Sequence, residues 1–212
     1  MPSLFEAHLY GILDTAYVAP SAMGSMAHEL IEGGIDLLQL RAKHSTHEEI
    51  ITMARALLPI TQRANIPLLL NDYPHLVPLV GAQGVHLGQN DMSVTQARAM
   101  LGGGYLIGLS THSLEQVHES REEAPDYIGF GPLFSTPTKP DYSAIGVHNI
   151  AAAQALVSCP VFCIGGINLT TLPHVLHAGA KRIVMVSALL KDTNPQAMTT
   201  TIKQSVMRAQ ER

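Results

Sequence analysis

The sequence predicts an α/β fold in which eight strand-and-helix pairs close into a single TIM barrel, the (β/α)8 fold. Three observations predict it. Short apolar segments alternate with longer amphipathic or Ala-rich segments, the alternation repeats without a linker, and 212 residues leave about 26 for each of eight pairs. Such alternation requires parallel strands joined by helical crossovers, and the alternative is an open doubly wound sheet. Residues 1–212 are expected to form one domain.

The predicted strands are apolar or β-branched runs that begin after turn residues. In order, they are expected at residues 8–13, 35–41, 67–71, 84–87, 105–109, 126–130, 160–164 and 181–186. The clearest helix between them is predicted from Thr46 to Asn65, where apolar residues from Ile50 onward recur near a period of 3.6 residues. Ser45 or Thr46 supplies its N-terminal cap, with Glu48 and Glu49 behind it.

Composition and charge exclude several classes of protein. Hydrophobic residues make up 46% of the chain and charged residues 14%, which suits a large aliphatic core. The net charge is −4 and Lys and Arg form no run, so no nucleic-acid partner is expected. No signal-like start or membrane-length apolar segment is present, and a cytoplasmic location is expected. Cys159 and Cys163 would lie roughly 13 Å apart along a strand, too far for a disulfide.

Polar and glycine-rich clusters follow the predicted strands, where a TIM barrel carries its functional residues. They are, from the second strand to the eighth, Gln39–Lys43, Asn71-Asp72, Gly88–Asp91, Ser110–His112, Gly131–Lys139, Gly165-Gly166 and Ser187. No strand begins with a comparable cluster. The barrel interpretation therefore predicts one site at the carboxyl ends of the strands.

Charged side chains stand in several of these clusters. Gln39, Arg41 and Lys43 alternate along a strand, so all three point to one side, where two cations favour an anionic ligand. The alternative is an internal ion pair with Asp36 or Glu32, or solvated side chains at the strand end. Asp72 and Asp91 follow neighbouring strands and could bind Mg²⁺ together. The alternative is that both cap helix N-termini.

Four further clusters bear on the site. The Gly165-Gly166 pair and Val186-Ser187 stand where TIM barrels commonly bind a phosphate through backbone N–H groups, although glycines also serve ordinary turns. The loop from Gly131 to about Gly146 is long enough to clamp a ligand, or is a surface loop stiffened by prolines. Ser110 and His112 resemble a nucleophile pair, but no acid is placed to orient the imidazole, so nucleophilic catalysis is not expected.

Together these segments resemble the thiamine phosphate synthase family, also called thiamine-phosphate pyrophosphorylase, from about Tyr10 to Leu190. The motifs that carry the resemblance are Gln39–Lys43, Asn71-Asp72, Gly84–Asp91, Gly108–His112, Thr136–Lys139, Ile164–Ile167 and Val186–Ala188. Each motif alone is weak, and seven in order at barrel spacing are specific. One departure is Gln83, since the family often has an acidic residue directly before Gly-Val-His. Gln83 is expected in a turn away from the proposed ligands.

The resemblance implies a role for each matching residue. The pyrimidine diphosphate would be bound by Gln39, Arg41, Lys43, Asn71, Ser110 and Lys139. Of these, Arg41, Lys43, Lys139 and Ser110 would act in catalysis. Asp72 and Asp91 would hold Mg²⁺, the implied cofactor. The thiazole phosphate would be bound by Thr136, Thr138, Gly166, Val186 and Ser187.

The implied activity is that of a transferase in thiamine biosynthesis. It would condense 4-amino-2-methyl-5-(diphosphooxymethyl)pyrimidine with 4-methyl-5-(2-phosphoethyl)thiazole, or the carboxylated thiazole, to give thiamine phosphate and pyrophosphate. Pyrophosphate would leave first, in a dissociative displacement assisted by Mg²⁺. The alternatives are a thiazole tautomerase of the same barrel family and a non-catalytic barrel that binds thiazole phosphate. The expected partners are small molecules, and a homo-oligomer is left open.

Overall fold

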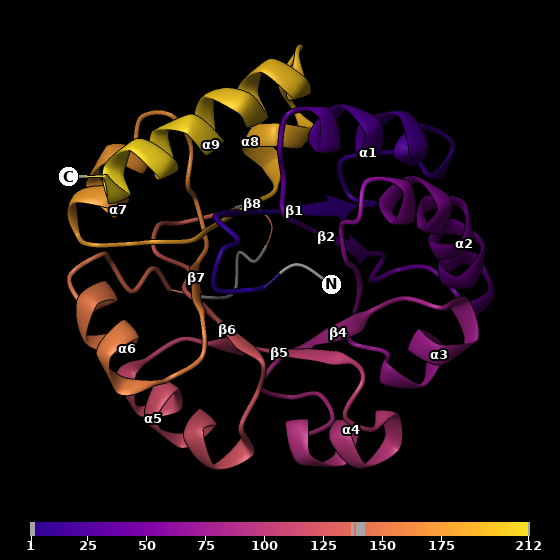
Figure 1. Cartoon of the computed structure of the whole chain (residues 1–212), viewed down its shortest axis with the longest axis horizontal. Helices are drawn as coiled ribbons and strands as arrows, with labels where there is room; N and C mark the ends of the chain where they lie inside the picture. The colour runs from indigo at the N-terminus through magenta and orange to yellow at the C-terminus, as the bar shows by residue number, and fades with distance from the viewer. Residues whose placement is uncertain (1–2, 137, 139–142, 212) are drawn as a thin grey trace.

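The computed structural model describes residues 3–136, 138 and 143–211, and over these residues the chain forms a closed barrel of parallel strands surrounded by helices. Figure 1 looks down the barrel, with the strands as the inner ring and the helices as the outer ring. The strands are β1 (Leu9–Asp14), β2 (Leu37–Arg41), β3 (Leu68–Asn71), β4 (Gly84–Leu87), β5 (Leu106–Thr111), β6 (Tyr127–Phe130), β7 (Val161–Cys163) and β8 (Ile183–Met185). The predicted (β/α)8 fold is confirmed.

Pairing between the first and last strands closes the sheet. Leu9 pairs with Ile183, Tyr10 with Val184, and the following residues continue the parallel register. An open doubly wound sheet would leave both strands with a free edge, so that alternative is wrong.

The helices follow the strands in order. They are η1 (Pro20–Ala22), α1 (Met23–Glu32), α2 (His47–Arg63), η2 (Pro74–Leu76), α3 (Val77–Val80), α4 (Val94–Leu101), α5 (Leu114–Glu123), α6 (Ile150–Leu156), α7 (Leu172–His177), α8 (Ser187–Leu190) and α9 (Pro195–Gln210). The predicted cap of α2 is confirmed: Thr46 accepts from the backbone of Glu49, whose side chain accepts from the backbone N–H of Thr46.

Some predicted boundaries differ from the structure. Strand β5 was expected to end at residue 109 but runs to Thr111, because Ser110 and Thr111 pair with Gly129 and Phe130 of β6. Strand β7 is shorter than expected, and Cys159 lies in the bend before it rather than within it. Both cysteines are nevertheless free, as predicted. Burial raises the pKa of the Cys163 thiol to about 12.

The described residues form two hydrophobic cores. The larger lies between the barrel and the surrounding helices. The smaller fills the inside of the barrel and contains Tyr10, Tyr127 and Phe162, whose rings pack edge to face at centroid distances of 5.4–5.8 Å. Glycines leave room for these rings, because a Cβ on Gly108 would lie 2.1 Å from Cζ of Tyr127. Large aromatic residues inside the barrel therefore require small residues on the neighbouring strands.

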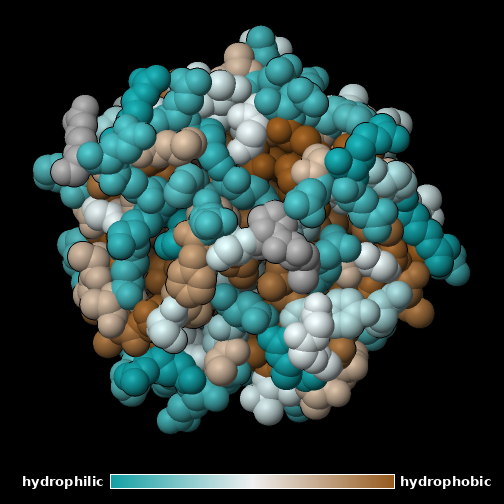
Figure 2. Space-filling view, in the orientation of Figure 1, coloured by the Kyte–Doolittle hydropathy of each residue, from teal (hydrophilic) through white to brown (hydrophobic). Residues whose placement is uncertain are grey.

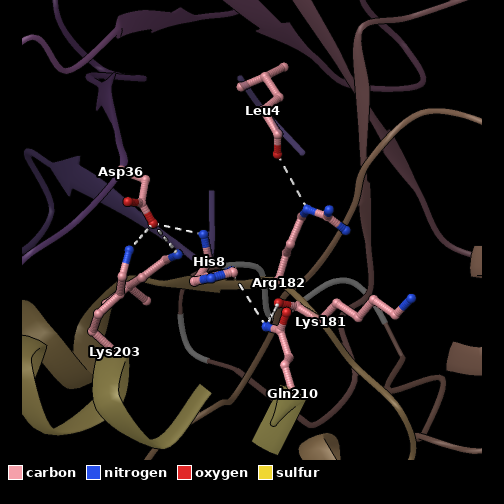
Figure 3. Close-up of polar contacts among 8 residues, drawn as sticks. Leu4, His8, Asp36, Lys181, Arg182, Lys203 and Gln210 are labelled. Atoms are coloured by element: carbon pink, nitrogen blue, oxygen red, sulfur yellow. Dashed lines mark hydrogen bonds and ion pairs between the residues drawn. The ribbon is translucent and has the colours of Figure 1, made fainter. Parts of the chain in front are cut away.

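The amino-terminal end of the barrel is closed by polar contacts, which Figure 3 shows. The carboxylate of Asp36 accepts from the backbone N–H groups of His8 and Leu9 at 2.7 and 2.9 Å, and pairs with Lys203 of α9. Arg182, just before β8, donates to the carbonyl oxygens of Leu4 and Phe5. These contacts fasten the N-terminal segment and α9 to this end of the barrel.

On the face of the molecule seen in Figure 2, no single apolar area dominates. In Figure 2 the hydrophobic areas are broken up by hydrophilic ones. The most exposed large hydrophobic residues of the described chain come from separate segments; they are Phe5, Leu79, Met100, Leu169 and Met207. None of the helices in the described residues is both long and apolar enough to cross a membrane.

Candidate active site at the carboxyl ends of the strands

A cavity opens at the carboxyl ends of the strands and encloses about 870 Å³ of empty space, its open mouth included. Nine of the sequence-predicted site residues line it. They are Gln39, Arg41, Asn71, Ser110, Thr136, Thr138, Gly166, Val186 and Ser187. These residues come from the ends of three strands, β2, β3 and β5, and from the segments after β6, β7 and β8, so the closed barrel brings together side chains that are far apart in the sequence.

Arg41 ends β2 and forms an ion pair with Asp14, the last residue of β1 and its register partner. The distance from Nη1 of Arg41 to Oδ2 of Asp14 is 2.5 Å. Asp14 is 1% exposed, and its other oxygen accepts from the backbone N–H of Ala16. The proposed partners Asp36 and Glu32 were wrong, because Asp36 binds Lys203 at the other end of the barrel and the partner of Arg41 is Asp14. The pair fixes one edge of the guanidinium while the side chain still lines the cavity.

Gln39 and Ser110 lie deeper, on opposite sides of the barrel interior. The amide of Gln39 donates to the hydroxyl of Tyr10 at 2.5 Å. The hydroxyl of Ser110 lies 2.9 Å from Nε2 of His86, and the carbonyl oxygen of Ser110 accepts from the side chain of Gln89. Both residues are nearly buried, so hydrogen bonds hold them in defined orientations at the base of the cavity.

The two predicted metal ligands lie beside one another, outside the residues that line the cavity. Burial, and then the negative charge of Asp91, raise the pKa of Asp72 above its ordinary value, while Lys43 opposes the shift from 3.5 Å. The N-cap alternative is wrong for Asp91, because Ser93 caps α4 and Asp91 accepts instead from the backbone N–H of Gly88.

Asp72 is not a helix cap either. It has a left-handed φ of 70°, and its backbone N–H donates to the carbonyl oxygen of His86 in the neighbouring strand. The short helix that follows has no side-chain cap. Two carboxylates that repel one another form an oxygen donor set that a cation would stabilise. Among the residues that the structure describes, no group of three or more His, Cys, Asp or Glu is placed to hold a metal.

Of the two predicted site lysines, Lys43 and Lys139, the structure describes Lys43. Lys43 contacts Asp72 and its side chain is 45% exposed, so it lies at the rim beside the carboxylates rather than in the cavity wall. Lys139 lies outside the described residues.

The predicted phosphate-binding loops meet on one side of the mouth. Gly165 and Gly166 both have positive φ values, 102° and 65°. A Cβ on Gly166 would lie 2.7 Å from Cβ of Phe134, since the loop after β6 packs directly onto this turn. Glycine is thus needed here because two loops pack closely, whether or not a ligand also approaches the backbone at this position. After the neighbouring strand β8, Val186 directly precedes the short helix α8, which begins at Ser187.

Two residues were not predicted from the sequence: Tyr10, which lines the cavity, and Asp14, which binds Arg41. Asp14 and Tyr10 lie on the first strand, which has no polar cluster after it, and only the register of β1 against β2 would have indicated Asp14. From their places in and just after a predicted strand, His86 and His112 were expected to be able to border the site, with a core or supporting role favoured for His86; His86 lines the cavity beside Ser110. The ring of His112 also lines the cavity, and its Nδ1 contacts the carbonyl oxygen of Gly131 rather than Ser110.

Comparison with known proteins gives a consistent result. Residues 9–189 match a family model described as thiamine monophosphate synthase. The chain is 42% identical to a thiamine-phosphate synthase of Thermus thermophilus over 167 residues, covering 78% of this chain and 80% of the relative. It is 37% identical to that of Halalkalibacterium halodurans, covering 87% and 88%. A relative from Synechococcus is 41% identical, but the match spans only 47% of its length.

Solved structures agree with the sequence comparison. A thiamine phosphate pyrophosphorylase from Pyrococcus furiosus superposes with a TM-score of 0.87 at 28% identity, with 96% of each chain covered. A 3-hexulose-6-phosphate synthase superposes with a TM-score of 0.67 at 14% identity, a likeness of fold alone.

Proposed function

Because the chain belongs to the thiamine monophosphate synthase family, we propose that its cavity joins a pyrimidine diphosphate to a thiazole phosphate and releases pyrophosphate. The substrates would be 4-amino-2-methyl-5-(diphosphooxymethyl)pyrimidine and 4-methyl-5-(2-phosphoethyl)thiazole or its carboxylated form. The observation that carries the proposal is the convergence of the matching residues on one cavity at the strand ends. Small molecules would be its only substrates.

We assign the two substrates to two sides of the cavity. The pyrimidine diphosphate would contact Gln39, Arg41, Asn71 and Ser110, with Lys43 and Lys139 also assigned to its diphosphate by the resemblance. The thiazole phosphate would contact Thr136, Thr138, Gly166, Val186 and Ser187. Binding both substrates in one cavity would make the bond between them effectively intramolecular.

The proposed reaction is a displacement at the methylene carbon of the pyrimidine. The carbon–oxygen bond to the diphosphate breaks first, the aminopyrimidine stabilises the cation that remains, and the thiazole nitrogen then bonds to that carbon. Negative charge grows on the leaving pyrophosphate, where Arg41 would donate hydrogen bonds from a guanidinium already held by Asp14. No side-chain nucleophile is needed.

Asp72 and Asp91 would hold the Mg²⁺ that the family implies. The raised pKa of Asp72 supports this, since two adjacent carboxylates, of which Asp72 is partly buried, favour a cation or a proton between them. When bound, Mg²⁺ would neutralise charge on the diphosphate. The carboxylates supply only part of a coordination shell, which fits an ion that keeps several waters and binds phosphate oxygens of a substrate.

The direct test is an assay of the purified protein with both substrates, Mg²⁺ and a measurement of thiamine phosphate and pyrophosphate. We expect both products in equal amounts, and none in the presence of EDTA. Formation of a thiazole isomer without pyrophosphate would instead identify a tautomerase, and binding of thiazole phosphate without any product would identify a non-catalytic barrel.

Removing one carboxylate at a time tests the metal assignment. We expect Asp72→Asn and Asp91→Asn each to lower turnover about a hundredfold or more, since metal stabilisation of a leaving group is worth several kcal/mol. Glu119→Gln is the control, because it removes one negative charge from the exposed surface of α5. Normal turnover of either Asp variant, or of the wild type in EDTA, would contradict the assignment.

A further inference from the structure

A continuous row of hydrogen-bonded side chains crosses the inside of the barrel and joins two residues of the proposed site. The amide of Gln39 donates to the hydroxyl of Tyr10, which lies 3.0 Å from the hydroxyl of Tyr127. The hydroxyl of Tyr127 lies 3.0 Å from Nδ1 of His86, and Nε2 of His86 lies 2.9 Å from Oγ of Ser110. We call these five residues the interior row.

The two tyrosines keep their protons at neutral pH. Burial raises the pKa of Tyr10 and of Tyr127, and both side chains are essentially inaccessible to water. Each phenol therefore has one proton to donate, and a buried hydroxyl that donates to nothing is costly.

The amide of Gln39 gives the interior row a direction. Among the described residues, the hydroxyl of Tyr10 contacts the amide nitrogen of Gln39 and the hydroxyl of Tyr127. An amide nitrogen only donates, so the oxygen of Tyr10 accepts from it and the proton of Tyr10 points to Tyr127. The proton of Tyr127 then points to Nδ1 of His86, which must be the acceptor.

The direction fixes what His86 offers to Ser110. A neutral imidazole that accepts at Nδ1 carries its proton on Nε2. That nitrogen therefore donates to Oγ of Ser110, and the proton of Ser110 is left free to point into the cavity. In the reverse direction Ser110 would donate to His86 and present only lone pairs to a ligand.

We propose that the interior row holds Ser110 as a hydrogen-bond donor toward the cavity, with His86 as a positioning residue in its Nε2–H form. The ligand group it serves is an acceptor, an anionic oxygen or a ring nitrogen of the pyrimidine diphosphate. This inference rests on the proposed function for the identity of the ligand. The direction of the row does not depend on it.

Packing keeps the row in place. The rings of His86 and Tyr127 are stacked with centroids 5.5 Å apart. A Cβ on Gly129 would lie 3.4 Å from Cε1 of His86, so the strand backbone lies directly against the imidazole. Rotation of His86 would require these groups to separate, which favours a single orientation of the ring.

The first experiment determines the position of the proton on His86 without any ligand. Long-range ¹⁵N–¹H correlation spectra of the full-length protein distinguish the two neutral forms of each histidine, and contacts with the Tyr127 ring identify His86. We expect the proton on Nε2. Tyr127→Phe removes the donor to Nδ1 and should populate both forms, whereas Tyr105→Phe, outside the row, should change nothing. A proton on Nδ1 in the wild type would overturn the proposal.

The second experiment tests whether His86 acts through Ser110. The dissociation constant of the pyrimidine diphosphate, without thiazole phosphate, is measured for His86→Leu, Ser110→Ala and the double variant. We expect each single variant to bind roughly tenfold to a hundredfold more weakly. The double variant should bind no more weakly than Ser110→Ala alone, because the two residues act as one unit. If the affinity losses of the two single variants multiply in the double variant, His86 acts independently of Ser110 and the inference is overturned.

The two experiments and the enzyme assay separate the possible failures. If the wild type makes thiamine phosphate but carries the His86 proton on Nδ1, only the proposed direction of hydrogen bonding along the interior row is contradicted. If the wild type carries the proton on Nε2 but makes no thiamine phosphate, only the proposed function is contradicted. His86→Gln places an amide near the position of Nε2 and should restore part of the binding lost in His86→Leu.

Discussion

The ion pair between Arg41 and Asp14 changes how Arg41 should be tested. Arg41→Ala alone leaves a carboxylate that is 1% exposed without its partner, and breaking such a buried pair costs about 3–5 kcal/mol. A loss of activity in that variant would therefore combine unfolding with lost catalysis. The double variant Arg41→Gln with Asp14→Asn removes both charges together.

We expect this double variant to be more stable than Arg41→Ala, while its release of pyrophosphate slows. Hydrogen bonds to a charged group are worth about 1.5–3 kcal/mol, or roughly a tenfold to hundredfold change in rate. Urea unfolding measures the first effect, and single-turnover release of pyrophosphate the second. Release at the wild-type rate would mean that Arg41 does not stabilise the leaving group.

Ionisation of Asp72 should destabilise the folded, metal-free protein as the pH rises. Because burial and Asp91 raise its pKa, the folded state favours the protonated carboxyl. Its stabilising contribution is present below the ordinary pKa of an aspartic acid and is lost as the pH rises through the raised value. Without divalent ions we therefore expect Asp72→Asn to be at least as stable as the wild type at neutral pH. Thermal unfolding measured upward from about pH 4, the ordinary pKa of an aspartic acid, would measure this; a clearly less stable Asp72→Asn variant would contradict it.

At the scale of single residues, sequence and structure agree where a residue follows a strand. Gln39, Asn71 and Ser110 were predicted to face one site because parallel strands end on the same side of a barrel, and all three line the cavity. Asp14 and Tyr10 were missed because their relation to Arg41 and Gln39 depends on which strands are neighbours and in what register. Neither the neighbours of a strand nor its register can be predicted from the sequence of that strand alone.

Gly108 of β5 illustrates how one strand limits another. Its φ is unremarkable, but a Cβ there would lie 2.1 Å from the Tyr127 ring. We expect Gly108→Ala to lower the free energy of unfolding by about 1–3 kcal/mol or more, as overpacked core substitutions do. Gly103→Ala is the matched control, since nothing lies within 4 Å of its Cβ. Equal stability of the two variants in urea unfolding would contradict the prediction.

At the scale of elements, local signals predicted the start of helix α2 better than its end, expected at Asn65 and found at Arg63, or the end of strand β5. The cap of α2 was predicted from Thr46, Glu48 and Glu49, because a capping box involves residues that are close in sequence. The end of β5 was missed because Ser110 and Thr111 are polar and look like loop residues. Pairing with β6 and the buried environment of the barrel keep them in the strand.

For the whole molecule, the structure separates stabilising contacts from the proposed chemistry. Arg182 donates to Leu4 and Phe5 at the amino-terminal end of the barrel, and the cavity lies at the opposite end. We expect Arg182→Ala to lower the free energy of unfolding by about 1–2 kcal/mol, because two hydrogen bonds are lost. Its turnover should equal that of the wild type at temperatures where both are folded. A reduced turnover in the folded variant would show that the two ends are coupled.

The contacts at that end also place both termini of the described chain far from the cavity. The N-terminal segment is bound by Arg182, and Gln210, at the end of α9, donates to the carbonyl oxygen of Lys181 at 2.8 Å. Figure 3 shows these attachments on one side of the barrel. The protein could therefore be immobilised on a solid support, or tethered to another protein, through either terminus, with its substrate entrance facing the solution.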